Sequence, residues 1–408
     1  MFNSLFPGWP NFTQEEVNAV SSVLLSNKVN YWTGQVGRLF EEKFSVFAGT
    51  KYAIALANGT VALDLALHGL KIGSRNGGRA DDEVIVTSRS FIASVSSIVN
   101  AGAQPVFADV DRSSGNVSGE TILPVLSSRT RAVLAVHLAG WPCDMDGLRD
   151  ALGNRDIRII EDCAQAHGAM YKGIPVGSLG DIAAWSFCQD KIMTTGGEGG
   201  MVTCSDDAIW RRMWAFKDHG KSYEAVYERE HPEGFRWLHE SIGTNWRLTE
   251  MQSAIGLVQL ERMPKWQAER AKNAAILTEA LLPFSGSNGP LRLETMSSQS
   301  SVVEGNISRH AWYKYYAYIR PGNLKKGWDR DRIVREISAL GVPCMQGSCS
   351  EIYLEKAFDN TRCRPKTALP IANELGKTSV MFLVHPGLSQ EDLSRMTEII
   401  SSVLHDTF

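Results

Sequence analysis

The sequence has no pair of cysteines spaced for the common zinc or redox motifs. Its seven cysteines stand singly, at positions 143, 163, 188, 204, 344, 349 and 363, and none belongs to a Cys-x-x-Cys pair. Structural zinc and dithiol redox chemistry are therefore disfavoured, and we expect no metal site. Scattered single cysteines are typical of reduced thiols, so we expect a cytoplasmic protein.

The sequence also lacks long apolar runs and a large excess of positive or negative charge. No stretch approaches the ~18 uninterrupted apolar residues that a membrane-spanning helix needs. The first twelve residues, MFNSLFPGWPNF, lack the basic-then-apolar pattern of a secretory signal. The 42 Lys and Arg residues nearly balance 45 Asp and Glu residues, for a formal net charge of -3. We therefore expect neither a membrane nor a nucleic acid as partner.

What the sequence does contain is an alternation of apolar strands and helices. A chain of 408 residues is too long for one simple core and suggests two domains. The strand-like runs are 52–57, 83–87, 105–110, 131–138, 157–161, 182–187 and 201–204. Continuous apolar strands separated by helices predict an α/β fold, with a mostly parallel mixed sheet covered by helices on both faces.

A second, smaller unit is expected in the C-terminal part. Thr249 and Gln252 form a capping-box pattern that predicts a long helix through about residue 280, which carries the chain out of the large domain. Strand-like runs at 313–319 and 380–384 alternate with helical stretches at 330–340 and 392–404. We therefore predict a large domain over residues 1–270 and a small α/β domain over residues 271–408.

Lys191 stands out between two apolar runs, in the stretch WSFCQDKIMTTGGEGGMVTC at 185–204. A buried ammonium costs several kcal/mol unless it is paired or neutralised. Condensation with an aldehyde to give a Schiff base is one way to neutralise it. A surface turn that leaves the ammonium in water is the alternative, and this stretch alone leaves both open.

Three predicted strands end in residues that suit a ligand site. Phe91 lies just after 83–87, Asp162 follows 157–161, and Lys191 follows 182–187. The carboxyl ends of parallel strands share one edge, where ligands gather. The turn at Gly59 and Thr60 places backbone N–H groups at the start of a predicted helix, which favours an anion; a plain helix cap is the alternative.

Seven segments carry a resemblance to a known family: NGTVALDLAL (58–67), DEVIVTSRSFIAS (82–94), AGAQPVFADVD (101–111), AVHLAGWPCDMD (135–146), IEDCAQAHGA (160–169), WSFCQDKIMTTGGEGG (185–200) and GTNWRLTEMQSAIG (243–256). In this order and spacing they resemble the DegT-like nucleotide-sugar aminotransferases, which are fold type I pyridoxal-phosphate enzymes. The resemblance implies an aspartate aminotransferase-like fold and pyridoxal 5'-phosphate as cofactor.

The resemblance also implies catalytic roles. Lys191 would hold the cofactor as a Schiff base and move a proton between the amino donor and the cofactor. Asp162 would face the pyridine nitrogen and keep it protonated, which makes the ring an electron sink. Glu161 should point to the other side of the strand.

Further residues would bind the cofactor by the same resemblance. Phe91 would stack on the ring, although an ordinary core aromatic is the commoner use of Phe. Gly59, Thr60 and Ser186 would hold the phosphate, and Gln165 would hydrogen-bond the ring oxygen. Asn245 would reach the phosphate from a neighbouring subunit, which implies a homodimer with shared sites; a simple turn residue is the alternative.

The activity that the resemblance implies is transamination of a nucleotide-linked keto-sugar, with glutamate as amino donor. The expected product is an amino sugar for surface polysaccharide or glycoconjugate biosynthesis. The stretch 345–358 favours a 4-keto-6-deoxyhexose on a nucleotide such as UDP. A regulatory relative that binds the cofactor without turnover and a sugar dehydratase relative are the alternatives. Dehydratases of this kind carry histidine in place of the lysine, so Lys191 favours transamination.

Two positions depart from the family pattern. Cys188-Gln189-Asp190 precedes the lysine where the family often has a proline and an aromatic or histidine, and Asn58 opens the phosphate turn where serine is common. Neither change removes a chemical group that the mechanism needs.

Overall fold

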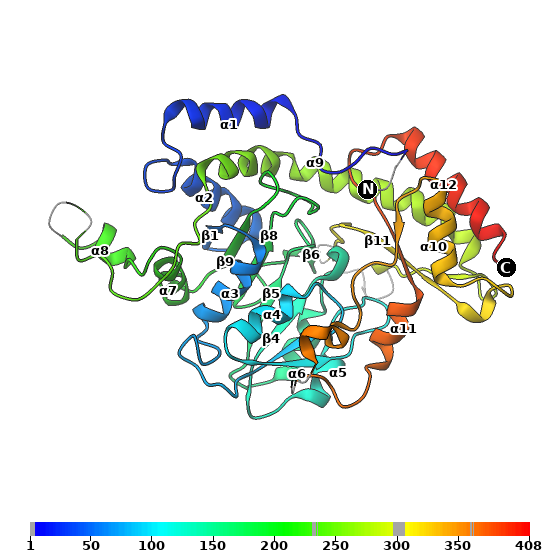
Figure 1. Ribbon diagram of the computed structural model, residues 1–408, viewed down its shortest axis with the longest axis horizontal. Helices are drawn as coiled ribbons and strands as arrows, with labels where there is room; N and C mark the ends of the chain where they lie inside the picture. The colour runs from blue at the N-terminus through cyan, green and yellow to red at the C-terminus, as the bar shows by residue number, and fades with distance from the viewer. Residues whose placement is uncertain (1–4, 231–233, 235, 297–306, 360, 362) are drawn as a thin grey trace.

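The computed structural model describes residues 5–230, 234, 236–296, 307–359, 361 and 363–408. Figure 1 shows a large part around one sheet and a smaller part on the right, with the long helix α9 (Glu250–Leu281) running across both. The division into a large domain over residues 1–270 and a small domain over residues 271–408 stays a prediction. The predicted boundary near residue 270 falls inside α9.

The large part is built on a seven-stranded sheet in the order β1-β9-β8-β5-β4-β2-β3. Its strands are β1 (Tyr52–Leu56), β2 (Glu83–Thr87), β3 (Gln104–Ala108), β4 (Thr130–Val136), β5 (Arg158–Asp162), β8 (Ile182–Ser186) and β9 (Gly200–Cys204). All neighbours pair in parallel except β9, which is antiparallel to both β1 and β8. The predicted fold class, a mostly parallel mixed sheet, is confirmed.

Alternating residues of each strand pack on opposite faces of the sheet. On β5, Ile159 belongs to one apolar cluster and Ile160 to the other. The helices α3 (Gly59–Gly69), α4 (Ala93–Asn100) and α7 (Asp207–Lys217) cover the face of Ile160, and α2 (Val36–Ala48) and α6 (Met145–Leu152) cover the face of Ile159. Because both faces are buried, the strands read as continuous apolar runs.

Helix α9 begins with the predicted capping box, since Thr249 and Gln252 cap each other's backbone. Its first half packs on α1 (Gln14–Ser26) and α2, and its second half contacts α12 (Gln390–His405). The smaller part holds a four-stranded antiparallel sheet in the order β10 (Leu291–Arg292), β11 (Tyr315–Ile319), β13 (Ser379–Phe382) and β12 (Cys344–Met345). Leu277 and Leu281 of α9 join its core, together with α10 (Arg330–Ala339) and α12.

The remaining elements are short. They are α5 (Gly119–Ile122), the hairpin of β6 (Met170–Tyr171) and β7 (Ile174–Pro175), α8 (Tyr223–Tyr227) and α11 (Pro370–Thr378), with single 3-10 turns between them. No helix of the described residues combines the length and the apolar character that crossing a membrane requires.

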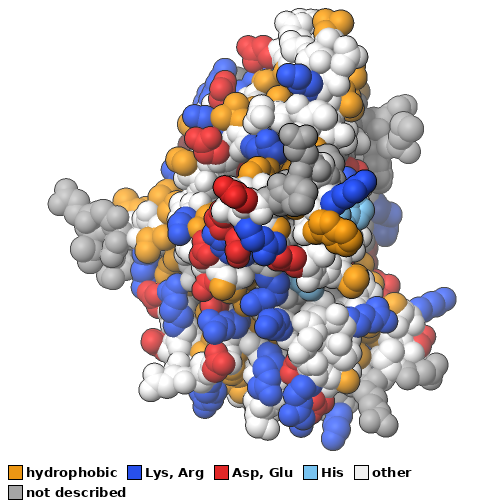
Figure 2. Space-filling model, turned by 90° about the vertical axis from the view of Figure 1, so that its left-hand side faces the viewer, with side chains coloured by type: hydrophobic (Ala, Val, Ile, Leu, Met, Phe, Trp, Pro, Cys, Tyr) orange, Lys and Arg blue, Asp and Glu red, His pale blue; other side chains and the backbone are white. Residues whose placement is uncertain are grey.

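The segment 218–240, which the sequence suggests is an excursion outside the core, is partly packed. Asp218 is fully buried and Leu238 nearly so, and Tyr223 of α8 lies edge-on to Trp214 at a centroid distance of 5.1 Å. Helix α8 projects to the left in Figure 1, while residues 231–233 and 235 lie outside the described chain. Figure 2, which faces this side, shows Lys, Arg, Asp and Glu interspersed rather than gathered by sign.

Candidate active site

A cavity of about 1140 Å³ lies where several strands of the main sheet end. The ends of β5 and β8, the segment after β2, and the start of α3 form one wall, and Tyr313 and Tyr316 of the smaller part form another. Seven of the eight predicted site residues line it: Gly59, Thr60, Phe91, Asp162, Gln165, Ser186 and Lys191. Asn245 does not. The cavity therefore brings together residues from sequence segments more than a hundred positions apart.

Lys191 lies in the connection between β8 and β9, with its side chain 17% exposed. Its Nζ is 3.5 Å from Asp190 Oδ1 and 3.4 Å from the Tyr313 hydroxyl, and 5.1 Å from the centre of the Tyr313 ring. The ammonium is therefore neither free in water nor buried without a partner. Of the two alternatives that the sequence leaves open, the structure supports a lysine held in a cavity.

Asp190 and Tyr313 are functional candidates that the sequence analysis missed. The Tyr313 hydroxyl donates a short hydrogen bond to Asp190 Oδ2. Burial alone would raise the pKa of Asp190, but the charge of Lys191, the Tyr313 hydroxyl and Lys314 together bring it below its ordinary value. Burial and the Asp190 charge raise the pKa of Tyr313 well above its usual range. The pair thus supplies a carboxylate and a neutral phenol beside the lysine nitrogen.

Asp162 ends β5 with its side chain almost fully buried. It accepts hydrogen bonds from Ser94 Oγ at 2.8 Å and from the Ala164 N–H at 3.1 Å. Burial raises the pKa of this carboxyl group, and no cation of the described residues forms an ion pair with it. A buried carboxylate that lacks a paired cation suits a ligand that brings a protonated ring nitrogen.

Glu161 points to the opposite face of β5, as predicted. Its carboxylate accepts the N–H groups of Leu179 at 2.8 Å, Gly180 at 2.6 Å and Gly177 at 2.9 Å, and lies 2.9 Å from His137 Nε2. His137, Glu161 and Cys163 are close enough to bind a metal ion. The carboxylate oxygens are already taken by these N–H donors, and His137 Nδ1 accepts the Cys143 N–H at 2.9 Å. The hydrogen bonds therefore give this cluster a structural role.

The start of α3 forms an anion cradle. The Asn58 side chain caps the helix by accepting the Val61 N–H at 3.0 Å, so it takes neither the Gly59 nor the Thr60 N–H, and neither has an acceptor within the helix. A Cβ on Gly59 would lie 2.6 Å from the Ser186 Cβ, so only glycine allows this close approach. Ser186 ends β8 beside this turn with its hydroxyl in the cavity wall.

The other predicted residues differ in how the protein holds them. Gln165 Oε1 accepts the Ala139 N–H at 2.7 Å. Because the oxygen is used in this contact, the NH₂ group of Gln165 is the end that can donate to a ligand. Phe91 lines the cavity but is 67% exposed. Asn245 is exposed and does not line the cavity of its own chain. Among the described residues, its side chain makes one long contact, in which Oδ1 accepts the Arg247 N–H at 3.5 Å.

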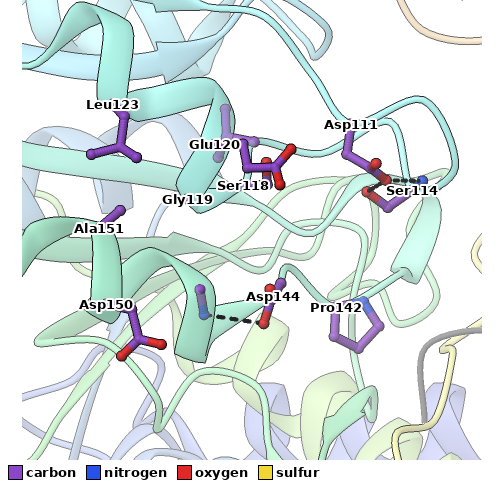
Figure 3. A pocket seen from close by; sticks show the side chains of 12 residues that line it. Asp111, Ser114, Ser118, Gly119, Glu120, Leu123, Pro142, Asp144, Asp150 and Ala151 are labelled. Atoms are coloured by element: carbon purple, nitrogen blue, oxygen red, sulfur yellow. Dashed lines mark hydrogen bonds between the residues drawn. The ribbon is translucent and has the colours of Figure 1, made fainter.

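A second cavity of about 560 Å³ lies away from Lys191, between the starts of α5 and α6. Figure 3 shows Asp111 with Ser114 on one side and Asp144 on another. Asp111 accepts the Ser114 N–H and hydroxyl, both at 2.8 Å, and Asp144 caps α6 while accepting the Tyr171 hydroxyl at 2.7 Å. Asp111 and Asp144 therefore serve local turns, and no predicted site residue lines this cavity.

The match to known proteins agrees with this geometry. Residues 10–401 fit the model of the DegT/DnrJ/EryC1/StrS aminotransferase family. The chain belongs to this family. The aminotransferase is 33% identical over 382 residues to the GDP-perosamine synthase of Caulobacter vibrioides, which covers 91% of this chain and 92% of that protein.

Two further relatives span almost the whole aminotransferase. The dTDP-3-amino-3,6-dideoxy-alpha-D-galactopyranose transaminase of Aneurinibacillus thermoaerophilus is 28% identical, with 95% of each chain covered. A crystal structure of an aminotransferase from Psychrobacter cryohalolentis superposes with a TM-score of 0.94 at 56% identity, covering 98% of this chain and 99% of that one.

Pyridoxal phosphate is the cofactor of this aminotransferase, and the residues present fit it. The buried carboxylate of Asp162 would hold the ring nitrogen, and the N–H groups at Gly59 and Thr60 with the Ser186 hydroxyl would hold the phosphate. Lys191 would offer the amine for covalent attachment. When bound, the cofactor supplies an electron sink for reactions at the carbon that carries the amino group.

Proposed function

We propose that the protein transfers an amino group from glutamate to a nucleotide-linked keto-sugar, a 4-keto-6-deoxyhexose. The product would be an amino sugar for surface polysaccharide or glycoconjugate biosynthesis. The single observation that carries this proposal is the joint presence of Lys191 and Asp162 in one cavity large enough for a sugar and part of its nucleotide. Two relatives, a GDP-perosamine synthase and a dTDP-3-amino-3,6-dideoxy-alpha-D-galactopyranose transaminase, support a nucleotide-linked sugar as substrate.

The residues around Lys191 suit the proton transfers of such a reaction. Its Nζ would take the proton from the α-carbon of the amino donor and deliver it to the cofactor carbon, and would move a proton in the opposite direction, toward the sugar carbon, in the second half-reaction. Asp190, 3.5 Å away, and the Tyr313 hydroxyl, 3.4 Å away, fix where this nitrogen stands. Asp162 would face the ring nitrogen of the cofactor, and a carboxylate at that place keeps the nitrogen protonated.

The keto-sugar would enter from the side of the smaller part. Tyr316, Ser348 and Glu355 line the cavity there. Tyr316 is held in place by the Ser348 N–H, which donates to its hydroxyl at 2.9 Å. Hydroxyl and carboxylate groups of this kind suit the hydroxyls of a sugar.

We further propose that the working enzyme is a homodimer in which Asn245 of each chain reaches the phosphate site of the other. Three observations support this. Asn245 is exposed, it lies just before the rigid start of α9, and its side-chain amide makes one long contact, of 3.5 Å, with the residues of its own chain that the structure describes. A side-chain amide can donate two hydrogen bonds to a phosphate without adding charge.

Two half-reactions test the function. The purified enzyme with its cofactor should change absorbance on addition of glutamate, and a panel of nucleotide keto-sugars should reverse that change for the true substrate. A regulatory relative without turnover would show no change with glutamate. A dehydratase would consume the keto-sugar without incorporating nitrogen, which mass spectrometry of the product separates from transamination.

A further inference from the structure

A smaller cavity, of about 60 Å³, lies beside Lys191. Its lining residues are Trp9, Asp190, Arg270, Tyr313, Lys314, Leu383, Val384 and His385. It shares Asp190, Tyr313 and Lys314 with the main cavity, so it is a side pocket of the active site. The Trp9 indole N–H donates to the Lys191 carbonyl at 2.7 Å, which places the wall of this side pocket directly against the backbone of the catalytic lysine.

Arg270 of α9 brings a buried positive charge to the side pocket. The residue is 2% exposed, and its Nη1 donates to the carbonyls of Trp312 at 3.1 Å and Tyr313 at 3.4 Å. Its Nε has no hydrogen-bond partner, and no carboxylate of the described residues pairs with its guanidinium. Burial lowers the pKa of Arg270 to about 9. The decrease reflects the lack, among the described residues, of a nearby carboxylate that would stabilise the charged guanidinium.

Two more basic side chains face the same space. Lys314 Nζ lies 4.7 Å from the centre of the Tyr313 ring, and burial lowers its pKa to about 8. His385 is 3% exposed and stacks on Trp9 at a centroid distance of 5.8 Å. Burial, together with the charges of Arg270 and Lys314, lowers the pKa of His385 to about 4, so its ring is neutral at neutral pH. Neither ring nitrogen of His385 meets strict hydrogen-bond geometry with a partner in the described chain, although the Pro7 carbonyl approaches the ring.

The charges of the side pocket do not balance. Asp190 is its one carboxylate among the described lining residues, and it is shared with Lys191 and Tyr313. Burying basic groups without an anion is costly, so a site with this excess favours a negatively charged ligand. A cavity of about 60 Å³ has the volume of about two water molecules, which suits a carboxylate group.

We propose that this side pocket, formed by Arg270, Lys314 and His385, binds a carboxylate group of the amino donor. The inference rests on the proposed transamination and names the residues that select the donor. The donor's nitrogen must come to the cofactor that Lys191 holds, and the Tyr313 hydroxyl, which borders the pocket, is 3.4 Å from Lys191 Nζ. Guanidinium and ammonium groups form strong, charge-assisted hydrogen bonds to carboxylates.

The sugar nucleotide is a poorer fit for this pocket. A diphosphate is larger than the space available, and the keto-sugar has no charge of its own to match Arg270 and Lys314. The cofactor phosphate already has its cradle at the start of α3. A small carboxylate is therefore the occupant whose size and charge both match.

Lys314→Met is the test variant, because no hydrogen bond or ion pair with a described residue depends on this ammonium. Lys326→Met, an exposed lysine of the same part of the chain, is the matched control. With glutamate as donor we expect Lys314→Met to raise KM for glutamate about 10-fold or more, with KM for the keto-sugar unchanged. Arg270→Lys, which keeps the charge but loses the planar fork, should raise KM for glutamate by a smaller factor.

A binding measurement tests carboxylate binding in the side pocket independently of turnover. Maleate, a dicarboxylate that cannot react, should bind the cofactor-loaded enzyme in calorimetry, with about 10-fold weaker affinity in Lys314→Met and parent affinity in Lys326→Met. Unchanged maleate affinity and unchanged KM for glutamate in Lys314→Met would overturn the proposal. A rise in KM for the keto-sugar alone would also overturn it, since the pocket would then serve the nucleotide.

The same experiments distinguish this inference from the proposed function. If the enzyme fails to accept glutamate yet binds maleate through Lys314, the carboxylate pocket stands and the donor assignment falls. Comparing glutamate with alanine identifies the carboxylate that is bound. A loss confined to glutamate assigns the pocket to the side-chain carboxylate, and an equal loss for both donors assigns it to the α-carboxylate.

Discussion

Glu161 and Asp162 are adjacent carboxylates that should affect different properties of the enzyme. Glu161 faces the interior and accepts three backbone N–H groups and His137. Asp162 faces the cavity and accepts one hydroxyl and one N–H. We predict that Glu161→Gln lowers stability strongly, and that Asp162→Asn lowers turnover at little cost to stability.

The loss of stability expected for Glu161→Gln follows from the N–H groups that donate to the Glu161 carboxylate. Each carboxylate oxygen accepts two N–H groups, so an NH₂ group at either place faces two buried donors that lose their acceptor. Each such loss costs about 1–3 kcal/mol, which predicts a decrease of about 2–6 kcal/mol in the free energy of unfolding. Burial alone would raise the pKa of Glu161, but His137 and the backbone N–H groups bring it below its ordinary value. The stabilisation is therefore present at neutral pH and is lost as the pH falls through the folded-state pKa.

Ionisation of Asp162 has the opposite effect on stability. Burial raises its pKa in the folded chain without cofactor, so above the unfolded pKa its ionisation favours unfolding. Asparagine removes this cost, and Asp162→Asn without cofactor should melt at the parent temperature or higher. The same change removes the charge that keeps the cofactor ring protonated, which should lower kcat about 100-fold or more.

Thermal melting of both variants, with and without cofactor, and steady-state kinetics check the pair. A melting temperature for Glu161→Gln lower by roughly 4 °C or more is expected. The reasoning is refuted if Glu161→Gln melts like the parent, or if Asp162→Asn turns over at the parent rate and instead loses stability without cofactor. The second result would mean that Asp162 serves mainly to cap the following turn.

Three further predictions concern the cofactor. Borohydride reduction followed by peptide mapping should place the pyridoxyl group on Lys191, and label on another lysine would refute the assignment; Lys191→Ala should bind the cofactor but not transaminate. Gly59→Ala should weaken cofactor binding about 10-fold or more in a dialysis assay, because its Cβ would lie 2.6 Å from the Ser186 Cβ; unchanged affinity would show that the turn can move. Mixing Lys191→Ala with Asn245→Ala chains should restore activity through one intact site per mixed dimer, whereas exchange of subunits without recovery would place Asn245 within its own site.

The parts of the site that the sequence predicts are those carried by continuous segments. Asp162 and Lys191 each follow a long apolar run, and the edge of a parallel sheet brings such residues together whatever the intervening helices do. Asp190 was noted only as a departure from a pattern, because its partner Tyr313 comes from the other part of the chain. Lys314, His385 and Arg270 were missed for the same reason, since only tertiary packing brings α9 and the smaller sheet against Lys191.

In the fold, too, elements with a strong local pattern are predictable, and elements that depend on pairing with distant strands are not. The apolar periodicity of 157–161 and 182–187 predicts β5 and β8 closely, but nothing in the local pattern of 201–204 shows that β9 runs antiparallel between β8 and β1. The short strands β10 and β12, two residues each, depend on pairing with β11 and β13 and carry no periodic signal of their own.

The pairing of β8 with β9 bears on how the specificity of such an enzyme can diverge. Ser186 pairs with Gly200, so residues 187–199, which include Lys191, form a loop closed at its base by the main sheet. The amine of Lys191, the carboxylate of Asp162 and the anion cradle at the start of α3 thus share one scaffold. Substitutions in the smaller part, at positions such as Lys314 or Tyr316, can alter which substrates fit while the distances among these three groups stay the same. Divergence in donor and sugar preference can then accumulate on one wall of the cavity, with the chemistry inherited unchanged on the other.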